Sequence, residues 1–284
     1  MSENKFQGDA ATQEMRKIAE DLSIQTVWER ALLQEPHCGF GMLGICCKNC
    51  NLGPCRIDPF GEGAQVGVCG ADADIIAARN LLRHIAAGAG CHNDHGREIV
   101  KVLNLVGQNK TQGYRINDAE KLKRIAQEYG LKTDGKEINK IAQELAERLS
   151  QEYGQQEGEL VLAQRAPKKQ KDIWRKNNLM PRGIDREVTE ALARTNIGVD
   201  NDYRSLMMHG MRVALSDGWG GSMIATELSD ILFSSPEPLQ AKANLGVLKE
   251  DQVNIIVHGH VPVLSDAIAT ASSDPELIKL AKEK

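Results

Sequence analysis

The sequence predicts a mainly α-helical N-terminal domain with an embedded cysteine-rich loop, followed by the beginning of an α/β domain. Three observations lead to this prediction. Apolar residues recur at helical spacing through most of residues 1–235, six of the seven cysteines lie within residues 38–69, and the period changes at 253–257. Because this last run is short and β-branched and precedes a turn and a helix, we expect a truncated Rossmann-like domain at 241–284, after a helical domain at 1–240.

Length and charge narrow the function classes. The 284 residues are enough for one large or two smaller hydrophobic cores, and a formal net charge of −4 gives no general attraction to nucleic acid. The first 30 residues lack the apolar core of a signal peptide, and no apolar run approaches the roughly 18 residues of a membrane span. We therefore expect a cytoplasmic protein with no transmembrane segment, and peripheral docking to a membrane partner stays open.

Capping residues mark the starts of several predicted helices. Asp9 precedes an amphipathic stretch at 10–22, and Thr26 opens a capping-box pattern. After the cysteine loop, Asp72 or its neighbour Asp74 precedes a long helix that extends to residue 106. The centre of this helix at 86–90 contains only alanine and glycine, which we expect where another backbone or a cofactor comes close.

The chain after this helix is expected to stay helical. Two charged amphipathic helices are predicted at 117–130 and 136–153, and residues 155–171 are expected to form a surface loop or linker. Glycines at 218–221 are expected to interrupt the chain before a last helix. A methionine stripe at helical spacing is expected to belong to the core, and it consists of Met207, Met208 and Met211.

The cysteine loop carries the strongest chemical signal. Cys47, Cys50, Cys55 and Cys69 are spaced C-x2-C-x4-C-x13-C, with glycines between most of them. Clustered thiols in a reducing compartment indicate metal or redox chemistry before disulfides. A structural zinc site usually has two C-x2-C knuckles, whereas a compact run followed by a distant cysteine is typical of a [4Fe–4S] cluster. A zinc ribbon with two spare thiols is the alternative.

Cys38 and Cys46 remain as a separate pair. Cys46 directly precedes Cys47, and adjacent residues rarely ligate one small cluster because their side chains diverge. A pair of ligands without a second pair suggests a site that another copy of the chain completes across a two-fold axis. The loop therefore suggests a homodimer.

Two histidines of the long helix and one near the end of the chain are candidate site residues. His92 and His95 share a helix face, and their spacing alone favours a structural role over proton handling. His260 follows the predicted strand at 253–257, where open α/β sheets bind ligands, although most histidines in such turns bind none. Cys91, beside His92, is expected to be a small buried apolar residue without a ligand role.

Three stretches of the sequence carry a resemblance to a known family: the cysteine loop CGFG-x4-CC-x2-C-x2-GPCR-x2-PFG, then VGVCGA, and later VHGHVPVLSD. With these residues the sequence resembles the catalytic subunit of anaerobic nickel-iron carbon monoxide dehydrogenase, in the hybrid-cluster (prismane-like) superfamily. The resemblance extends over essentially all 284 residues. It implies oxidation of CO with water to CO₂, with electrons passing through [4Fe–4S] clusters to a ferredoxin-like acceptor. The matching ligands are Cys47, Cys50, Cys55 and Cys69 for a relay cluster, and Cys38 and Cys46 for a cluster shared by two subunits.

The same resemblance assigns roles to the histidines. His92 matches an acid/base near a nickel-iron-sulfur cluster, and His95 matches the next residue of an outward proton path. Glu98 and Lys101 stand where some relatives have further histidines, which puts the long path in doubt here. His260 matches the histidine that ligates an iron of the nickel-iron-sulfur cluster.

The chain departs from the family in one respect. The family continues with two α/β domains that supply five cysteines to the nickel cluster, and no cysteine follows Cys91 here. We therefore expect an N-terminal portion of the enzyme that is inactive alone. Two alternatives stay open: a hydroxylamine reductase of the hybrid-cluster type, and a non-enzymatic iron–sulfur electron-transfer module.

Overall fold

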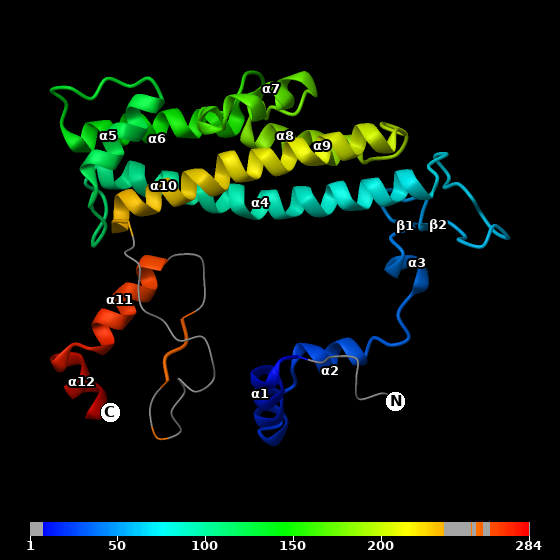
Figure 1. Ribbon diagram of the computed structural model, residues 1–284, viewed down its shortest axis with the longest axis horizontal. Coiled ribbons are helices and arrows are strands. Elements are labelled where there is room, and N and C mark those ends of the chain that lie inside the picture. Colours follow the sequence, from blue (N-terminus) through cyan, green and yellow to red (C-terminus); the bar gives the residue numbers. More distant parts are fainter. Residues whose placement is uncertain (1–7, 236–250, 252–253, 258–261, 284) are drawn as a thin grey trace. The chain divides into compact units, whose positions relative to one another are not determined.

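Figure 1 shows a computed structural model, in which residues 8–235, 251, 254–257 and 262–283 are described. The chain forms two compact units. One unit contains the described residues up to Met42 together with 251 and 254–257, and the other runs from Leu43 to 235 and includes 262–283. The predicted boundary near residue 240 lies outside the described residues.

The first unit begins with three short helices: α1 (Ala10–Asp21), α2 (Val27–Leu32) and α3 (Gly39–Met42). Asp9 caps α1 as predicted, because its Oδ1 accepts a hydrogen bond from the Thr12 N–H at 2.8 Å. The predicted capping box of α2 is also confirmed, with the Thr26 N–H donating to Glu29 Oε2 at 2.7 Å.

The second unit is organised around one long helix, α4 (Ala73–Gly107), which is about 52 Å long at 1.5 Å per residue. Of the two predicted caps, Asp72 is the one used, since its Oδ1 accepts from the Ile75 N–H at 2.9 Å. Figure 1 shows α4 extended alongside α9 and α10, and it also packs against α6 and α8. The cysteine loop lies at the start of α4.

The other elements of this unit are mostly helices. They are β1 (Cys46–Cys47), β2 (Cys55–Arg56), α5 (Ala119–Glu128), α6 (Ile138–Gly154), the 3₁₀ turn η1 (Leu162–Arg165), α7 (Lys168–Lys176), α8 (Ile184–Arg194), α9 (Tyr203–Ser216), the π-helical turn η2 (Asp217–Gly221), α10 (Ser222–Phe233), α11 (Pro262–Ser272) and α12 (Pro275–Lys282).

Two hydrophobic cores lie along α4. The larger one joins the second half of α4 to α5, α6 and α10, and the smaller one joins its first half to α8, α9 and the cysteine loop. The prediction of a surface loop at 155–171 is wrong, because Leu160, Leu162 and Ala163 are buried in the larger core. Their apolar side chains anchor a segment whose polar composition suggested a linker.

The predicted interruption at 218–221 is also wrong. The backbone continues from α9 through η2 into α10, and the glycines let this π-helical turn lie directly on α4. A Cβ placed on Gly96 of α4 would lie 2.5 Å from Gly221 O and 2.5 Å from Tyr153 Oη. At Gly88 and Gly90, where close approach was expected, a Cβ would meet no described atom within 4 Å.

The methionine stripe does not belong to the core. Met211 is 55 % exposed, and Met207 and Met208 are also exposed on α9. Helical spacing identifies a shared face but does not specify what covers that face. The prediction of a core role is therefore wrong in this structure.

The start of an α/β domain is not confirmed. Residues 254–257, the described part of the predicted strand, have no regular secondary structure. A strand forms only by pairing with another strand, and in the part of the chain described here the only pair is β1 with β2. No helix among the described residues has both the length and the apolar character needed to cross a bilayer.

Candidate metal centre

Four of the predicted ligands lie around one cavity. Cys47, Cys50, Cys55 and Cys69 line a small cavity between the cysteine loop and the first turns of α4. The antiparallel pairing of β1 with β2 places Cys47 directly opposite Cys55, and none of the seven cysteines is in a disulfide. Thiols that the sequence separates by up to 22 residues thus meet at a single site.

Backbone geometry in the loop directs N–H groups toward these sulfurs. The Val68 N–H donates to Cys55 Sγ at 3.4 Å. The residue before it is glycine for a steric reason, because a Cβ on Gly67 would lie 3.3 Å from both Cβ and Sγ of Cys55. Gly70 has a φ of +82°, which allows the turn that brings Cys69 back to the cavity.

The start of α4 supplies a cationic wall. Arg79 is 1 % exposed and lines the cavity, where its Nη1 donates to Cys69 Sγ at 3.4 Å. Burial raises the pKa of the Cys69 thiol, but the hydrogen bond and charge of Arg79 outweigh burial, so this pKa lies below its usual value. This lower pKa favours the thiolate form of Cys69, which is the form that binds a metal.

Polar contacts fix the loop to the helices around it. Asn80 of α4 donates from Nδ2 to the carbonyl oxygens of Gly44 and Cys46, at 2.9 and 3.0 Å. At the end of α8, Thr195 O accepts from Asn49 Nδ2 at 3.4 Å, and its hydroxyl accepts from Arg83 at 2.7 Å. These contacts hold the cysteine loop against α4 and the end of α8.

The surroundings of the thiols favour one of the two metal hypotheses. A structural zinc site usually takes its four sulfurs from two C-x2-C knuckles. Here the Val68 N–H and the buried guanidinium of Arg79 donate to the sulfurs of Cys55 and Cys69. Donors of this kind are typical around the sulfurs of a [4Fe–4S] cluster, so the site favours that cluster over zinc.

Cys38 and Cys46, the remaining pair of predicted ligands, lie in different units of the structure. Cys46 is half-buried in β1 and does not line the cavity, as expected for a strand residue next to Cys47, because successive side chains point to opposite faces. Cys38 is exposed at the start of α3, in the other unit. The separation of Cys46 from the four-thiol cavity is consistent with a second site.

His92 has a partner that the sequence analysis missed. Its Nδ1 lies 2.9 Å from Asp217 Oδ1 and 3.1 Å from Oδ2, and Ser222 Oγ donates to Asp217 Oδ1 at 2.8 Å. An ionised carboxylate can only accept, so His92 donates from Nδ1 and keeps Nε2 available. The signal was the aspartate before the glycines at 218–221, and π-helical turns such as η2 often occur at functional sites.

His95 and the positions after it do not extend this contact. His95 is exposed and makes no hydrogen bond or ion pair within the described residues. Glu98 and Lys101 pair with each other at 2.5 Å. His92 lies about 20 Å along α4 from Arg79 at 1.5 Å per residue, so the histidine and the four-thiol cavity are separate parts of one helix. His260 lies outside the described residues.

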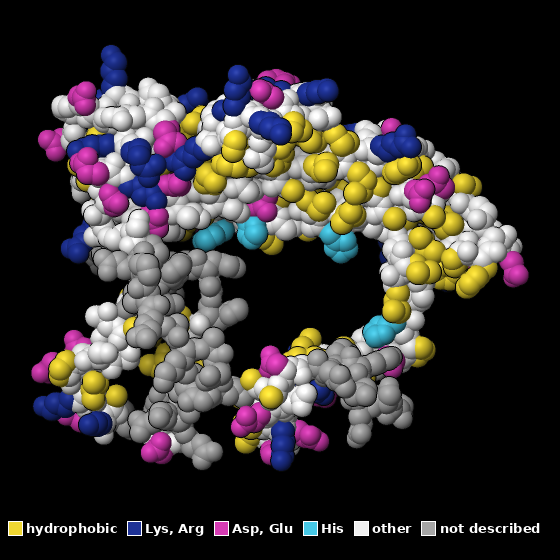
Figure 2. All heavy atoms as spheres, in the orientation of Figure 1, with side chains coloured by type: hydrophobic (Ala, Val, Ile, Leu, Met, Phe, Trp, Pro, Cys, Tyr) yellow, Lys and Arg dark blue, Asp and Glu magenta, His cyan; other side chains and the backbone are white. Residues whose placement is uncertain are grey.

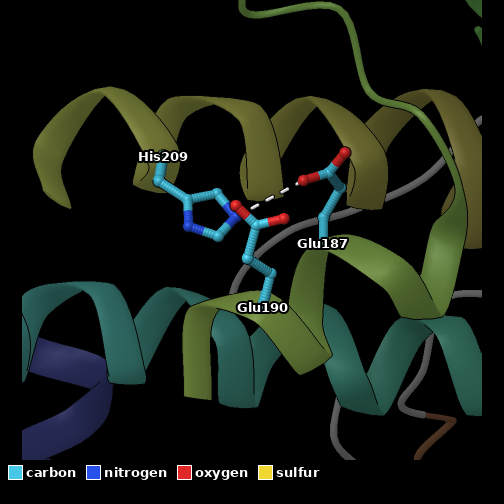
Figure 3. A group of neighbouring side chains, drawn as sticks. All are labelled: Glu187, Glu190 and His209. Atoms are coloured by element: carbon cyan, nitrogen blue, oxygen red, sulfur yellow. Dashed lines mark ion pairs between the residues drawn. The ribbon is translucent and has the colours of Figure 1, made fainter. Parts of the chain in front are cut away.

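A second group of potential ligands is an ion-pair cluster rather than a cation site. Figure 3 shows Glu187 and Glu190 from α8 facing His209 of α9, with His209 Nε2 3.3 Å from Glu187 Oε2. Arg182 and Arg212 bind the same carboxylates, at 2.9 and 2.7 Å from Glu187 Oε2. Burial raises the pKa of Glu187, but its hydrogen bonds to His209 and Arg182 have a larger opposite effect, so this pKa lies below its usual value. The two guanidiniums beside the carboxylates would repel a metal ion.

Comparison with known proteins identifies the family. Residues 45–284 match the model of the Prismane/CO dehydrogenase family, which is more than half of the chain. The chain belongs to this family. A curated relative, carbon monoxide dehydrogenase 1 of Methanosarcina acetivorans, is 54% identical over 97% of this chain and 44% of its own length. The chain thus spans less than half the length of the curated relatives it matches.

Two solved structures of the family share the fold of the chain. The nickel-free carbon monoxide dehydrogenase from Thermococcus sp. AM4, produced without CooC maturase, has a TM-score of 0.87 at 51% identity and covers 100% of this chain and 46% of its own. Carbon monoxide dehydrogenase IV from Carboxydothermus hydrogenoformans has a TM-score of 0.85 at 42% identity, covering 99% and 44%. The mainly helical fold is therefore that of this family.

Proposed function

We propose that this chain is the cluster-carrying helical portion of a carbon monoxide dehydrogenase, which converts CO and water to CO₂, protons and electrons. The observation that carries the proposal is the gathering of four cysteines around one cavity, with a buried guanidinium hydrogen-bonded to the sulfur of one of them. The identity of 54% to a curated carbon monoxide dehydrogenase supports the reaction. The reducing conditions that such thiols require support a cytoplasmic location.

Cys47, Cys50, Cys55 and Cys69 would hold the [4Fe–4S] relay cluster, which when bound accepts and releases single electrons. In this proposal the surrounding residues support the cluster in three ways. The Val68 N–H donates to Cys55 Sγ, Asn80 holds the backbone of the loop, and the apolar side chains of the smaller core limit access of water. Electrons would leave toward a ferredoxin-like acceptor.

A homodimer would complete the site of Cys38 and Cys46, because two cysteines are too few ligands for one cluster. Exposed apolar residues in the cysteine loop support a second copy as partner. Figure 2 shows hydrophobic side chains gathered at the end of the molecule that carries β1 and β2. Phe60 there is 86% exposed, and Leu52, Val66 and Val68 are also exposed. A patch of this kind is typical of a protein interface.

His92 would accept and release the protons of the reaction. Asp217 positions it, because the Nδ1–H bond fixes the ring and leaves Nε2 to take a proton, while the carboxylate stabilises the imidazolium that forms. Ser222 in turn orients Asp217. His95, exposed on the same helix face, would be the next residue outward, and the Glu98–Lys101 pair ends the histidine series there.

His260 would ligate an iron of the nickel-iron-sulfur cluster. After the six cysteines assigned above, only Cys91 of the seven remains, and it is exposed on α4 rather than buried as we expected. The residues present are therefore too few to hold that cluster, so we expect no CO oxidation by the chain alone.

The experiment is anaerobic purification of the full-length protein, followed by metal and sulfide analysis and an assay of CO-dependent viologen reduction. We expect iron, acid-labile sulfide and CO-dependent activity, with the activity lost in Cys50→Ser and kept in the matched control Cys91→Ser. Reduction of hydroxylamine without CO oxidation would instead assign a hybrid-cluster reductase. Electron transfer with neither substrate would assign a non-enzymatic module, and either result would contradict the proposal.

A further inference from the structure

Arg79 is a buried charge that has no carboxylate partner in the part of the chain that the structure describes. It is 1% exposed, and its Nη2 donates to Asp200 O at 2.7 Å and to Asn201 Oδ1 at 2.5 Å, both of which are uncharged acceptors. No ion pair joins it to a carboxylate, and its Nε–H has no partner, within the described residues. A buried charge is costly unless it is paired.

Another buried arginine of the same unit is paired in the usual way. Arg212 is 5% exposed, and its guanidinium lies 2.7 Å from Glu187 and 3.3 Å from Glu190. The lack of a carboxylate at Arg79 is therefore not a general property of this protein. Asp200 contacts Arg79 only through its backbone oxygen, because its carboxylate is paired with Arg194.

The position of Arg79 indicates where the missing negative charge lies. Its Nη1 donates to Cys69 Sγ at 3.4 Å, and its side chain lines the cavity around the four thiols. When four thiolates bind an iron–sulfur core, they outweigh its positive charge, and the cluster is anionic. One-electron reduction adds a further negative charge and requires no bond or proton to change. A fixed cation beside the cluster stabilises the reduced form more than the oxidised form.

We propose that Arg79 is the counter-ion of the cluster bound by Cys47, Cys50, Cys55 and Cys69, and that its charge raises the reduction potential of this cluster. This inference rests on the proposed function, which supplies both the cluster and, through CO oxidation, the electron. Arg79 acts through Cys69 and the electric field in the cavity, so it is a positioning and tuning residue rather than a catalytic one.

The test is a potentiometric titration of the anaerobically purified protein. The reduced cluster is measured through its EPR signal, which is identified as the signal that Cys50→Ser removes. In Arg79→Gln we expect the reduced-to-oxidised ratio at fixed potential to fall at least tenfold, a shift of about 59 mV to lower potential. Arg79→Lys keeps the charge and is expected to recover most of the shift. The matched control is Arg97→Gln, which lies on the same helix about 27 Å further along at 1.5 Å per residue and pairs with Asp94 and Asp185; its potential stays at the wild-type value.

A second variant keeps the test decisive if Arg79→Gln fails to bind iron. Asn201→Asp leaves Arg79 in place and puts a carboxylate 2.5 Å from its Nη2, so it offsets the charge and lowers the potential. A potential unchanged in a cluster-loaded Arg79→Gln or Asn201→Asp protein overturns the role of Arg79 alone. A wild-type protein that contains no iron–sulfur cluster overturns both this inference and the proposed function.

Discussion

The contact between α4 and η2 makes a sharp prediction about two glycines of one helix. In Gly96→Ala, the new Cβ would lie 2.5 Å from Gly221 O and 2.5 Å from Tyr153 Oη, and the first of these is backbone that cannot rotate away. Overpacking of this kind costs about 3 kcal/mol. The gain in helix propensity returns about 1 kcal/mol, which leaves a net loss of about 2 kcal/mol.

Gly88→Ala is the matched control. It lies on the same helix, is exposed, and would place its Cβ where no described atom lies within 4 Å. Only the propensity gain of about 1 kcal/mol remains, so this variant should be more stable than wild type.

Thermal unfolding followed by circular dichroism measures both effects. A change of 1 kcal/mol shifts the melting temperature of a domain of this size by about 2–4 °C. We expect Gly88→Ala to raise the melting temperature by about that amount and Gly96→Ala to lower it by about twice as much. If the two variants melt at the same temperature, the close packing of η2 on α4 is wrong, and with it the position of Asp217 beside His92.

Three further predictions concern the site residues. Cys50→Ser should lose about four irons and about four sulfides per chain, measured by metal and sulfide analysis, whereas Cys91→Ser should lose none; equal losses would contradict the ligand assignment. Asp217→Asn should lower CO-dependent viologen reduction in the full-length protein about tenfold or more and alter its pH profile, since general acid–base catalysis contributes on the order of 10²-fold or more; an unchanged rate and profile would remove Asp217 from the mechanism. Glu187 has a folded-state pKa below its usual value of 4.5, so its ionised form stabilises the fold above that pH and this contribution is lost as the pH falls. The melting temperature of Glu187→Gln should therefore be lower than wild type at pH 7 and fall less between pH 5 and pH 3; parallel curves would show that the carboxylate does not titrate with folding.

Helix starts and the cysteine site could be predicted from the sequence, because they depend on residues that are close together along the chain. Asp9, Thr26 and Asp72 were identified as helix starts from sequence because a cap is a contact within three residues. The spacing of Cys47 to Cys69 predicts one shared site, and these four cysteines line one cavity in the structure.

Long-range packing explains where the sequence analysis failed. The glycines of η2 were interpreted as a break because their packing against Gly96 of α4, more than 100 residues away, is not visible in a local window. The residues at 155–171 were interpreted as a linker because their few apolar side chains gain importance only when the core of α5, α6 and α10 surrounds them. Asp217 was missed for the same reason, since its partner His92 comes from a distant helix.

The central claim is that Cys47, Cys50, Cys55 and Cys69 bind a [4Fe–4S] cluster. Its most direct test is the iron, zinc and acid-labile sulfide content of the protein purified without oxygen. The account predicts a brown protein with equal amounts of iron and sulfide and little zinc. A colourless protein with one zinc per chain and no sulfide would contradict it.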